Sequence, residues 1–93
     1  MATSSNQVIS IEAKLVDGEN HLRSGEYLLA FRDSLVVLSR LTGGDKDYLT
    51  RVRNLACNAS DKLAEQAQKD DNVTMTQIYT LWRNIIQSYK PAN

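Results

Sequence analysis

The sequence is poor in the side chains that most often build catalytic and metal sites. Its 93 residues include one cysteine, Cys57, and one histidine, His21. A single cysteine excludes an internal disulfide framework, and the pair falls short of the clustered ligands that a metal site needs. A thiol nucleophile with a histidine base also needs a group that orients the imidazole, and none is evident in the sequence. We therefore expect no catalytic residues, no metal, no cofactor and no enzymatic activity.

An excess of charge of either sign is also absent. Lysine plus arginine and aspartate plus glutamate each number 11, so the formal net charge is zero. Without a basic excess to neutralise phosphates, a dedicated nucleic-acid binder is not expected. No apolar run approaches the roughly 20 residues of a membrane-spanning helix. The first residues, MATSSNQ, lack the basic and apolar regions of a signal peptide. These features predict a soluble, cytoplasmic protein.

Proline and glycine are sparse, with one proline and four glycines in the chain. Between them apolar residues recur at helical spacing, and no convincing alternating segment predicts a strand. The pattern predicts helices over about residues 6–23, 25–42, 46–69 and 74–90. Links this short favour antiparallel neighbours. We expect residues 1–93 to form one domain, an all-α, up-down antiparallel bundle of four helices.

The expected helix ends follow from local signals. Ser24, Asp45 and Thr74 are N-cap candidates for the second, third and fourth helices, and Ser4 with Gln7 can form a capping box for the first. Gly43 and Gly44 are expected to end the second helix in the left-handed conformation. Gly18 interrupts the first helix at a cost on the order of 1 kcal/mol relative to alanine, which close packing would explain. The expected buried face of the first helix consists of Val8, Ile11, Leu15 and Leu22.

The fourth predicted helix carries the most regular amphipathic pattern in the chain. Its stripe consists of Met75, Ile78, Trp82, Ile85 and Tyr89, at steps of three and four residues. We expect this stripe to face the core, with Trp82 buried against the first or second helix. Tyr79 and Arg83 lie beside the stripe and are expected at the surface.

The second predicted helix has more apolar surface than one buried face requires. Ten of the fifteen residues from Tyr27 to Leu41 are apolar, whereas a helix on one side of a domain needs about a third of its surface apolar. Docking of the fourth helix on the second would cover the excess, and we favour this arrangement. Otherwise Leu29 and Val36 remain exposed and mark an interaction site.

The segment from Asp17 to Leu38 resembles a known helical hairpin. It contains Asp17, then Gly25-Glu26-Tyr27 with Ala30, then Val37-Leu38. This order is similar to the signature of the microtubule-interacting-and-transport (MIT) domain, which tetratricopeptide repeats share. Residues 52–65 are similar in texture to the third MIT helix, so the resemblance covers about residues 13–69. It implies a three-helix MIT-like core followed by an additional amphipathic helix.

The resemblance also implies a function, that of an adaptor receiving a helical or extended peptide segment between its second and third helices. The expected partner is a protein or peptide, and an adaptor role in trafficking or cytoskeletal assembly is one form of it. The expected partner-binding residues line that groove, as floor or charged rim: Leu29, Val36, Arg53, Ala56, Ala59, Lys62 and Leu63. The alternative is a structural or homo-oligomeric bundle, such as a homodimer or a fragment of a vinculin- or talin-like rod.

Overall fold

The fold is entirely helical in the part of the chain that the structure describes. The computed structural model describes the backbone of residues 3–91 and the side chains of residues 11–91. This range contains four helices and no strand: α1 (Thr3–Arg23), α2 (Tyr27–Arg40), α3 (Lys46–Lys69) and α4 (Val73–Ser88). The predicted all-α four-helix fold is confirmed.

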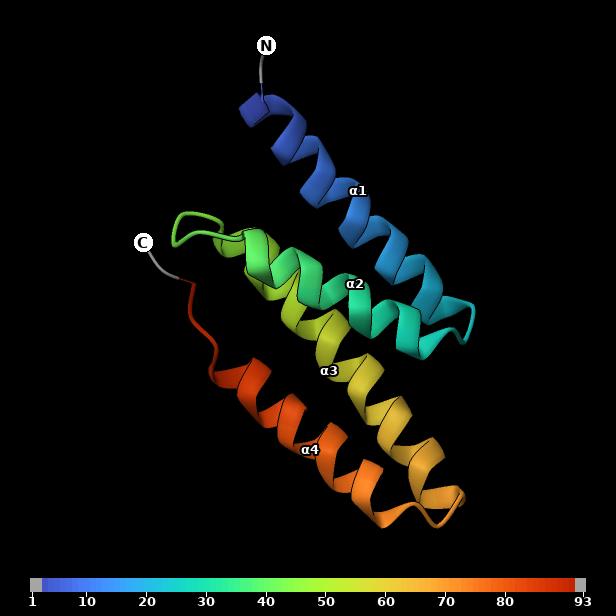
Figure 1. Cartoon of the computed structure of the whole chain (residues 1–93). Helices are drawn as coiled ribbons and strands as arrows, with labels where there is room; N and C mark the ends of the chain where they lie inside the picture. The colour runs from blue at the N-terminus through green and yellow to red at the C-terminus, as the bar shows by residue number, and fades with distance from the viewer. Residues whose placement is uncertain (1–2, 92–93) are drawn as a thin grey trace.

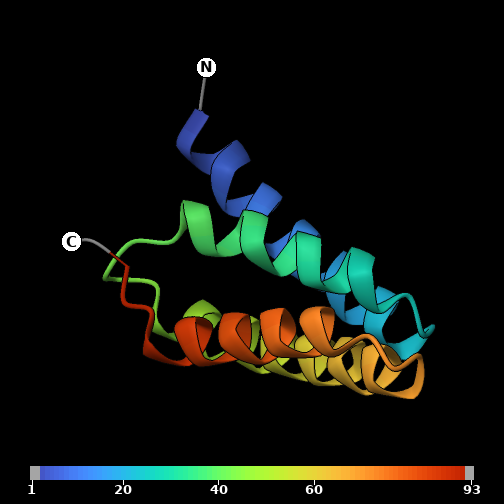
Figure 2. The same cartoon turned by 60° about the horizontal axis from the view of Figure 1, so that its bottom comes forward.

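The helices lie beside one another in chain order, and each runs antiparallel to the one before (Figure 1). α2 packs against both α1 and α3, whereas α4 packs along α3 alone at the level of the backbone. Figure 2 shows α2 above the layer formed by α3 and α4. The molecule measures 50 × 27 × 18 Å. α4 has α3 as its only neighbour at the level of the backbone and therefore forms one margin of the bundle.

The position of α4 differs from the expected docking on α2. α4 meets α2 only through side chains, where the ring of Phe31 contacts the edges of Tyr79 and Trp82 at centroid distances of 6.4 Å each. With α4 at this margin, Leu29 and Val36 are neither fully covered nor freely exposed, and both are half-buried.

Several helix ends differ from the predicted ones. α1 begins at Thr3 rather than near Asn6, and the capping side chains proposed for Ser4 and Gln7 lie outside the described side chains. Ser24 does not cap α2, because its amide still bonds to the carbonyl of Asn20 in α1. The N-cap of α4 is Asn72 rather than Thr74, and its side chain accepts from the amide of Met75 at 3.1 Å.

The third predicted helix has the observed bounds, and Asp45 holds its N-cap position. The Asp45 carboxylate nevertheless accepts from the Thr42 amide at 2.8 Å rather than from the first turn of α3. Gly43 and Gly44 do not end α2 in the left-handed conformation. α2 ends at Arg40, and its C-cap residue Leu41 has an extended backbone. Positive φ angles occur among the described residues only at Gly25 and Asp71.

These two residues end α1 and α3 with the same hydrogen-bond pattern. After α1, the amide of Gly25 bonds to Leu22 and that of Glu26 to His21. After α3, the amide of Asp71 bonds to Gln68 and that of Asn72 to Ala67. This is the Schellman arrangement, in which a left-handed residue satisfies the last free carbonyls of a helix. The same type of turn therefore reverses the chain between α1 and α2 and between α3 and α4.

The core lies along α3 and the facing sides of α1 and α2. Its buried side chains include Ile11 and Leu15 of α1, Phe31 and Val37 of α2, and Leu55 of α3. Leu22 is half-buried, as its place on the same face of α1 predicts, and Val8 lies outside the described side chains.

Gly18 allows α1 to approach the other two helices closely. A Cβ atom at this position would lie 2.7 Å from Cδ2 of Leu55 and 3.2 Å from Cβ of Asp33. Such distances leave no room for even one methyl group. The close packing expected from the glycine is therefore present, and it brings α1 against both α2 and α3.

Candidate functional site

The seven residues predicted to line a groove between α2 and α3 range from fully buried to exposed. Ala56 and Ala59 are fully buried and Leu63 is 7% exposed. All three belong to the continuous hydrophobic core, because α2 packs directly on this face of α3. The residues predicted as a floor for a partner therefore pack inside the protein itself.

The two predicted rim charges have partners within the chain. Arg53 is half-buried, and its guanidinium donates to the backbone carbonyl of Tyr89, which holds the end of α4 against α3. Lys62 is exposed and lies 3.7 Å from Glu65, one turn along the same helix. These side chains come from the right helix but do not face a shared opening.

The largest departure from the sequence prediction concerns the orientation of α4. Met75 of its regular stripe is half-buried, but the other four side chains are exposed, and Trp82, expected to be buried, is 41% exposed. Ile86 is the buried residue of this helix, and Tyr79 packs against the core beside it. The exposed residues form one continuous strip, which we call the α4 face: Ile78, Leu81, Trp82, Ile85 and Tyr89.

An ion pair also joins α4 to α3 in this orientation. Nε of Arg83 lies 2.7 Å from Oδ1 of Asp61 on α3, so Arg83 points toward α3 rather than to the open surface. Tyr79, Arg83 and Ile86 step by four and three residues and form the side of α4 that meets the core. The sequence analysis did not identify this second stripe, because an arginine is usually found at the surface.

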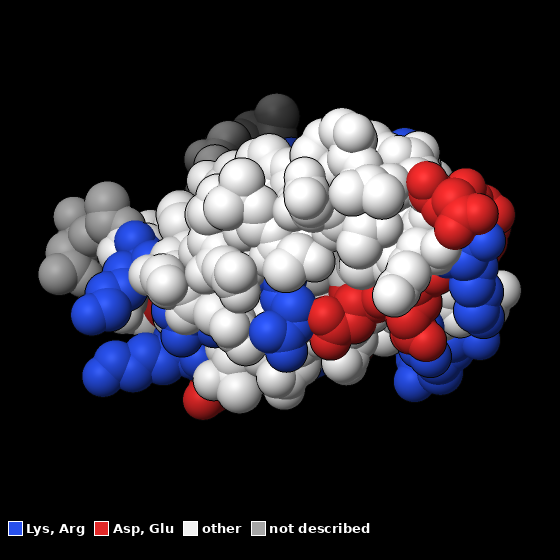
Figure 3. Space-filling view, turned by 90° about the horizontal axis from the view of Figure 1, so that it is seen from below, with Lys and Arg blue, Asp and Glu red and all other residues white. Residues whose placement is uncertain are grey.

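The α4 face carries no charged side chain. Arg83 is the only charged residue between Val73 and Ser88, and it is turned toward Asp61. In the view from below, a broad area without lysine, arginine, aspartate or glutamate has charged side chains gathered along its margins (Figure 3). On α2, Leu28 precedes Phe31 by one turn and is 59% exposed. Phe31 contacts Trp82, so Leu28 lies one turn from the point where α2 meets α4.

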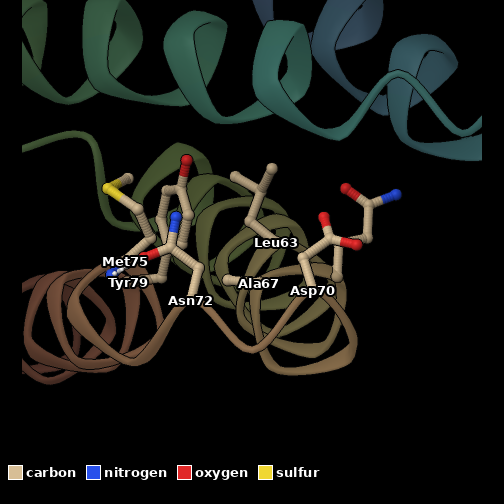
Figure 4. Close-up of a pocket in the computed structure, with 7 residues that line it drawn as sticks. Leu63, Ala67, Asp70, Asn72, Met75 and Tyr79 are labelled. Atoms are coloured by element: carbon tan, nitrogen blue, oxygen red, sulfur yellow. Dashed lines mark hydrogen bonds between the residues drawn. The ribbon is translucent and has the colours of Figure 1, made fainter.

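A shallow pocket lies where α3 turns into α4. Leu63, Ala67, Met75 and Tyr79 contribute its apolar walls, and the polar residues of the turn close one end (Figure 4). Its volume is about 190 Å³, whereas sites for drug-sized ligands usually measure about 300–1,000 Å³. The pocket is therefore a shallow indentation rather than a site for a sizeable small molecule.

His21 lies between two carboxylates at the α1–α2 turn. Its Nδ1 is 3.0 Å from Oε1 of Glu26, and its Nε2 is 3.7 Å from Oδ2 of Asp33. The expectation that no group orients this imidazole is therefore wrong. Asp33 is buried, and Lys14 and Arg32 approach it at 3.9 and 3.7 Å. These cations offset the cost of burying a carboxylate, so the cluster joins α1 to α2.

Cys57 lies apart from His21, on the side of α3 that faces α4. The charges that act on its thiol are those of Arg83, Asp61 and Arg53. Burial raises the pKa of the Cys57 thiol above its ordinary value, which lowers the fraction of reactive thiolate at neutral pH. The described part of the chain also holds no group of three or more histidine, cysteine, aspartate or glutamate side chains placed to bind a metal ion.

Comparison of the chain with models of known protein families, with curated proteins and with solved structures finds no match. Within residues 3–91, no helix is long and apolar enough to cross a membrane.

Proposed function

We propose that this chain is a non-enzymatic protein-interaction module that binds a helical segment of a partner protein on the α4 face. One observation carries the proposal: four of the five side chains in the most regular apolar stripe of the molecule are exposed, on a helix that has a neighbour on one side only. Exposed, contiguous apolar surface of this kind usually marks an interaction site. The adaptor role and the cytoplasmic location expected from the sequence remain part of this proposal.

A helical partner suits the geometry of the surface. Ile78, Leu81, Trp82 and Ile85 recur at the spacing by which one helix packs its side chains between those of another. Membrane-surface helices, by contrast, combine an apolar face with lysine and arginine on the polar face. The single cation of α4, Arg83, is engaged by Asp61. The surface therefore favours a protein over a lipid bilayer.

The test uses two variants of α4 that differ only in the side of the helix they occupy. Leu81→Glu places a charge on the α4 face at a side chain that is 59% exposed. Asn84→Glu adds the same charge at an exposed position outside the face. Both variants should keep the helicity of the wild type by circular dichroism. Affinity purification from cells should recover the partner with wild type and Asn84→Glu, and at least about tenfold less with Leu81→Glu. Equal recovery with all three would overturn the proposal.

A further inference from the structure

The ends of α4 carry opposite charges, although its exposed face carries none. Asp70 and Asp71 lie three and two residues before the helix, next to Lys69 at the end of α3, and leave a net negative charge there; Lys90 lies two residues after the helix. Within residues 3–91, the ion pairs involve neither these two carboxylates nor the Lys90 ammonium group. α4 has 16 residues and is therefore about 24 Å long. The α4 face, from Ile78 to Tyr89, takes up about 17 Å of this length and lies between an acidic end and a basic end.

We propose that the partner on the α4 face is a second copy of this chain, with the two α4 helices packed antiparallel about a two-fold axis. The proposal rests on the proposed function, because it names the partner for the same surface. A two-fold interface places the same patch of both copies in contact. Antiparallel packing brings the Lys90 end of each copy to the Asp70–Asp71 end of the other, so the contact occurs at both ends of the pair. Parallel packing would place acid beside acid.

The composition of the surface favours a second copy over an unrelated chain of strong charge. The strip between the two ends is uncharged, so two copies meet without burying an unpaired charge. The formal net charge of the chain is zero, so long-range repulsion does not oppose the encounter of two identical molecules. A strongly basic or acidic partner segment would match only one end of α4 and would oppose the other.

The size of the surface predicts a weak dimer. Between 37% and 59% of each of the five side chains is exposed. Since a fully buried aromatic side chain contributes about 150–250 Å², the face offers on the order of 500 Å² per copy. A standard specific interface buries about 800 Å² per partner. The neighbouring Leu28 and the charged ends extend the contact, and the dimer belongs at the weak end of the range.

Sedimentation equilibrium of the purified chain, from about 1 µM to about 1 mM, tests the association directly. We expect a monomer–dimer equilibrium, with the fluorescence of Trp82 shifting to shorter wavelength as the dimer fills, because the indole leaves water. Leu81→Glu should weaken the dimer at least about tenfold. Val16→Glu, which alters an exposed apolar residue of α1, should leave it unchanged. A monomer throughout this range, or equal weakening by both variants, would overturn the proposal.

Charge reversal tests the orientation. Asp70→Lys and Lys90→Glu should each weaken the dimer about two- to fivefold, because each leaves like charges facing one another. The double variant should recover most of the wild-type association. If the double variant instead weakened the dimer by as much as the two single variants together, the antiparallel arrangement would be excluded.

Cross-linking provides a second test of orientation. In a Cys57→Ala background, chains with Thr74→Cys mixed with chains carrying Ser88→Cys should form mostly the mixed disulfide under mild oxidation. In an antiparallel pair centred near Leu81, these two positions approach each other. The two Ser88 positions are then about 20 Å apart, at 1.5 Å per residue. Predominant Ser88→Cys homodimers would overturn the arrangement.

The two proposals fail in different ways. If the chain stays monomeric but Leu81→Glu loses a cellular partner that Asn84→Glu retains, self-association is wrong and the interaction surface stands. If the chain dimerises equally well with Leu81→Glu, the α4 face is not the surface of contact and the antiparallel pairing is overturned.

Discussion

α3 and α4 are neighbouring amphipathic helices, yet the helix with the smaller apolar side chains buries them far more completely. On α3, the alanines at 56 and 59 have no exposed surface. On α4, the larger side chains of Trp82 and Ile85 remain 41% and 47% exposed. An amphipathic pattern therefore indicates that a face is suited to burial, but it does not show that the same chain covers it.

The difference follows from the number of helices that surround each one. α3 contacts α1, α2 and α4, whereas α4 has only α3 along its backbone. Small residues let the helices around α3 approach closely, so a thin apolar stripe is enough to fill the space between them. The wide stripe of α4 has one neighbour to cover it, and Tyr79 and Ile86 already occupy that contact.

The sharpest test of this comparison places the same side chain on both helices. Ala59→Arg forces a charge into fully buried space and should destabilise the fold by at least about 4 kcal/mol. Leu81→Arg, at a side chain that is 59% exposed, should change the free energy of unfolding by no more than about 0.5 kcal/mol. Urea unfolding followed by circular dichroism at low protein concentration measures both. Similar losses would show that α4 is buried as α3 is.

The contact between α1 and α3 offers a second test. Gly18→Ala gains about 1 kcal/mol of helix propensity, but its methyl group would meet Leu55 and Asp33, both almost fully buried. Overpacking of this kind costs about 1–3 kcal/mol, so we expect a net loss of roughly 1 kcal/mol. Gly44→Ala is the control, because a Cβ there meets nothing within 4 Å. A thermal melt in which Gly18→Ala is more stable than wild type would contradict the close approach.

Sequence periodicity predicted the existence of all four helices and the bounds of α3. It failed for the ends that depend on backbone conformation. Gly25 was expected to lie at the start of the second helix, whereas it supplies the left-handed residue that ends the first. Local residue preferences alone did not distinguish these two roles.

The candidate site was harder to predict for a different reason. Helical periodicity identifies an apolar face but not the element that packs on it. The spacing of the alanines of α3 is therefore compatible with an exposed groove and with a buried core. In the observed rotation of α4, Tyr79 and Ile86 face the core and Arg83 pairs with Asp61, a residue 22 positions away. Such a long-range ion pair is not visible in the spacing of either helix.

Truncation of Trp82 distinguishes the predicted orientation of α4 from the observed one. A fully buried tryptophan would cost about 3–5 kcal/mol on truncation to alanine. With 41% of the residue exposed and one ring contact to Phe31, we expect about 1–2 kcal/mol for Trp82→Ala. Phe31→Ala should cost more, because Phe31 is buried and contacts both aromatic rings of α4. Chemical denaturation with circular dichroism ranks the two variants. A larger loss at Trp82 would mean that the regular stripe of α4 faces the core after all.

The smallest expected effect concerns the turn that sets α4 against α3. Asp71 adopts a φ angle of 57°, a left-handed conformation that disfavours side chains and suits glycine. Asp71→Gly removes this strain and should stabilise the fold by about 0.5 kcal/mol, because the gain in the folded state exceeds the greater freedom of the unfolded glycine. Gly25→Asp at the equivalent position after α1, where φ is 80°, should lose about 1 kcal/mol. One variant replaces aspartate by glycine and the other replaces glycine by aspartate, at two turns that have the same hydrogen-bond pattern. Thermal unfolding of both variants measures the difference. A loss of stability at Asp71→Gly would show that the aspartate side chain itself holds α4 against α3.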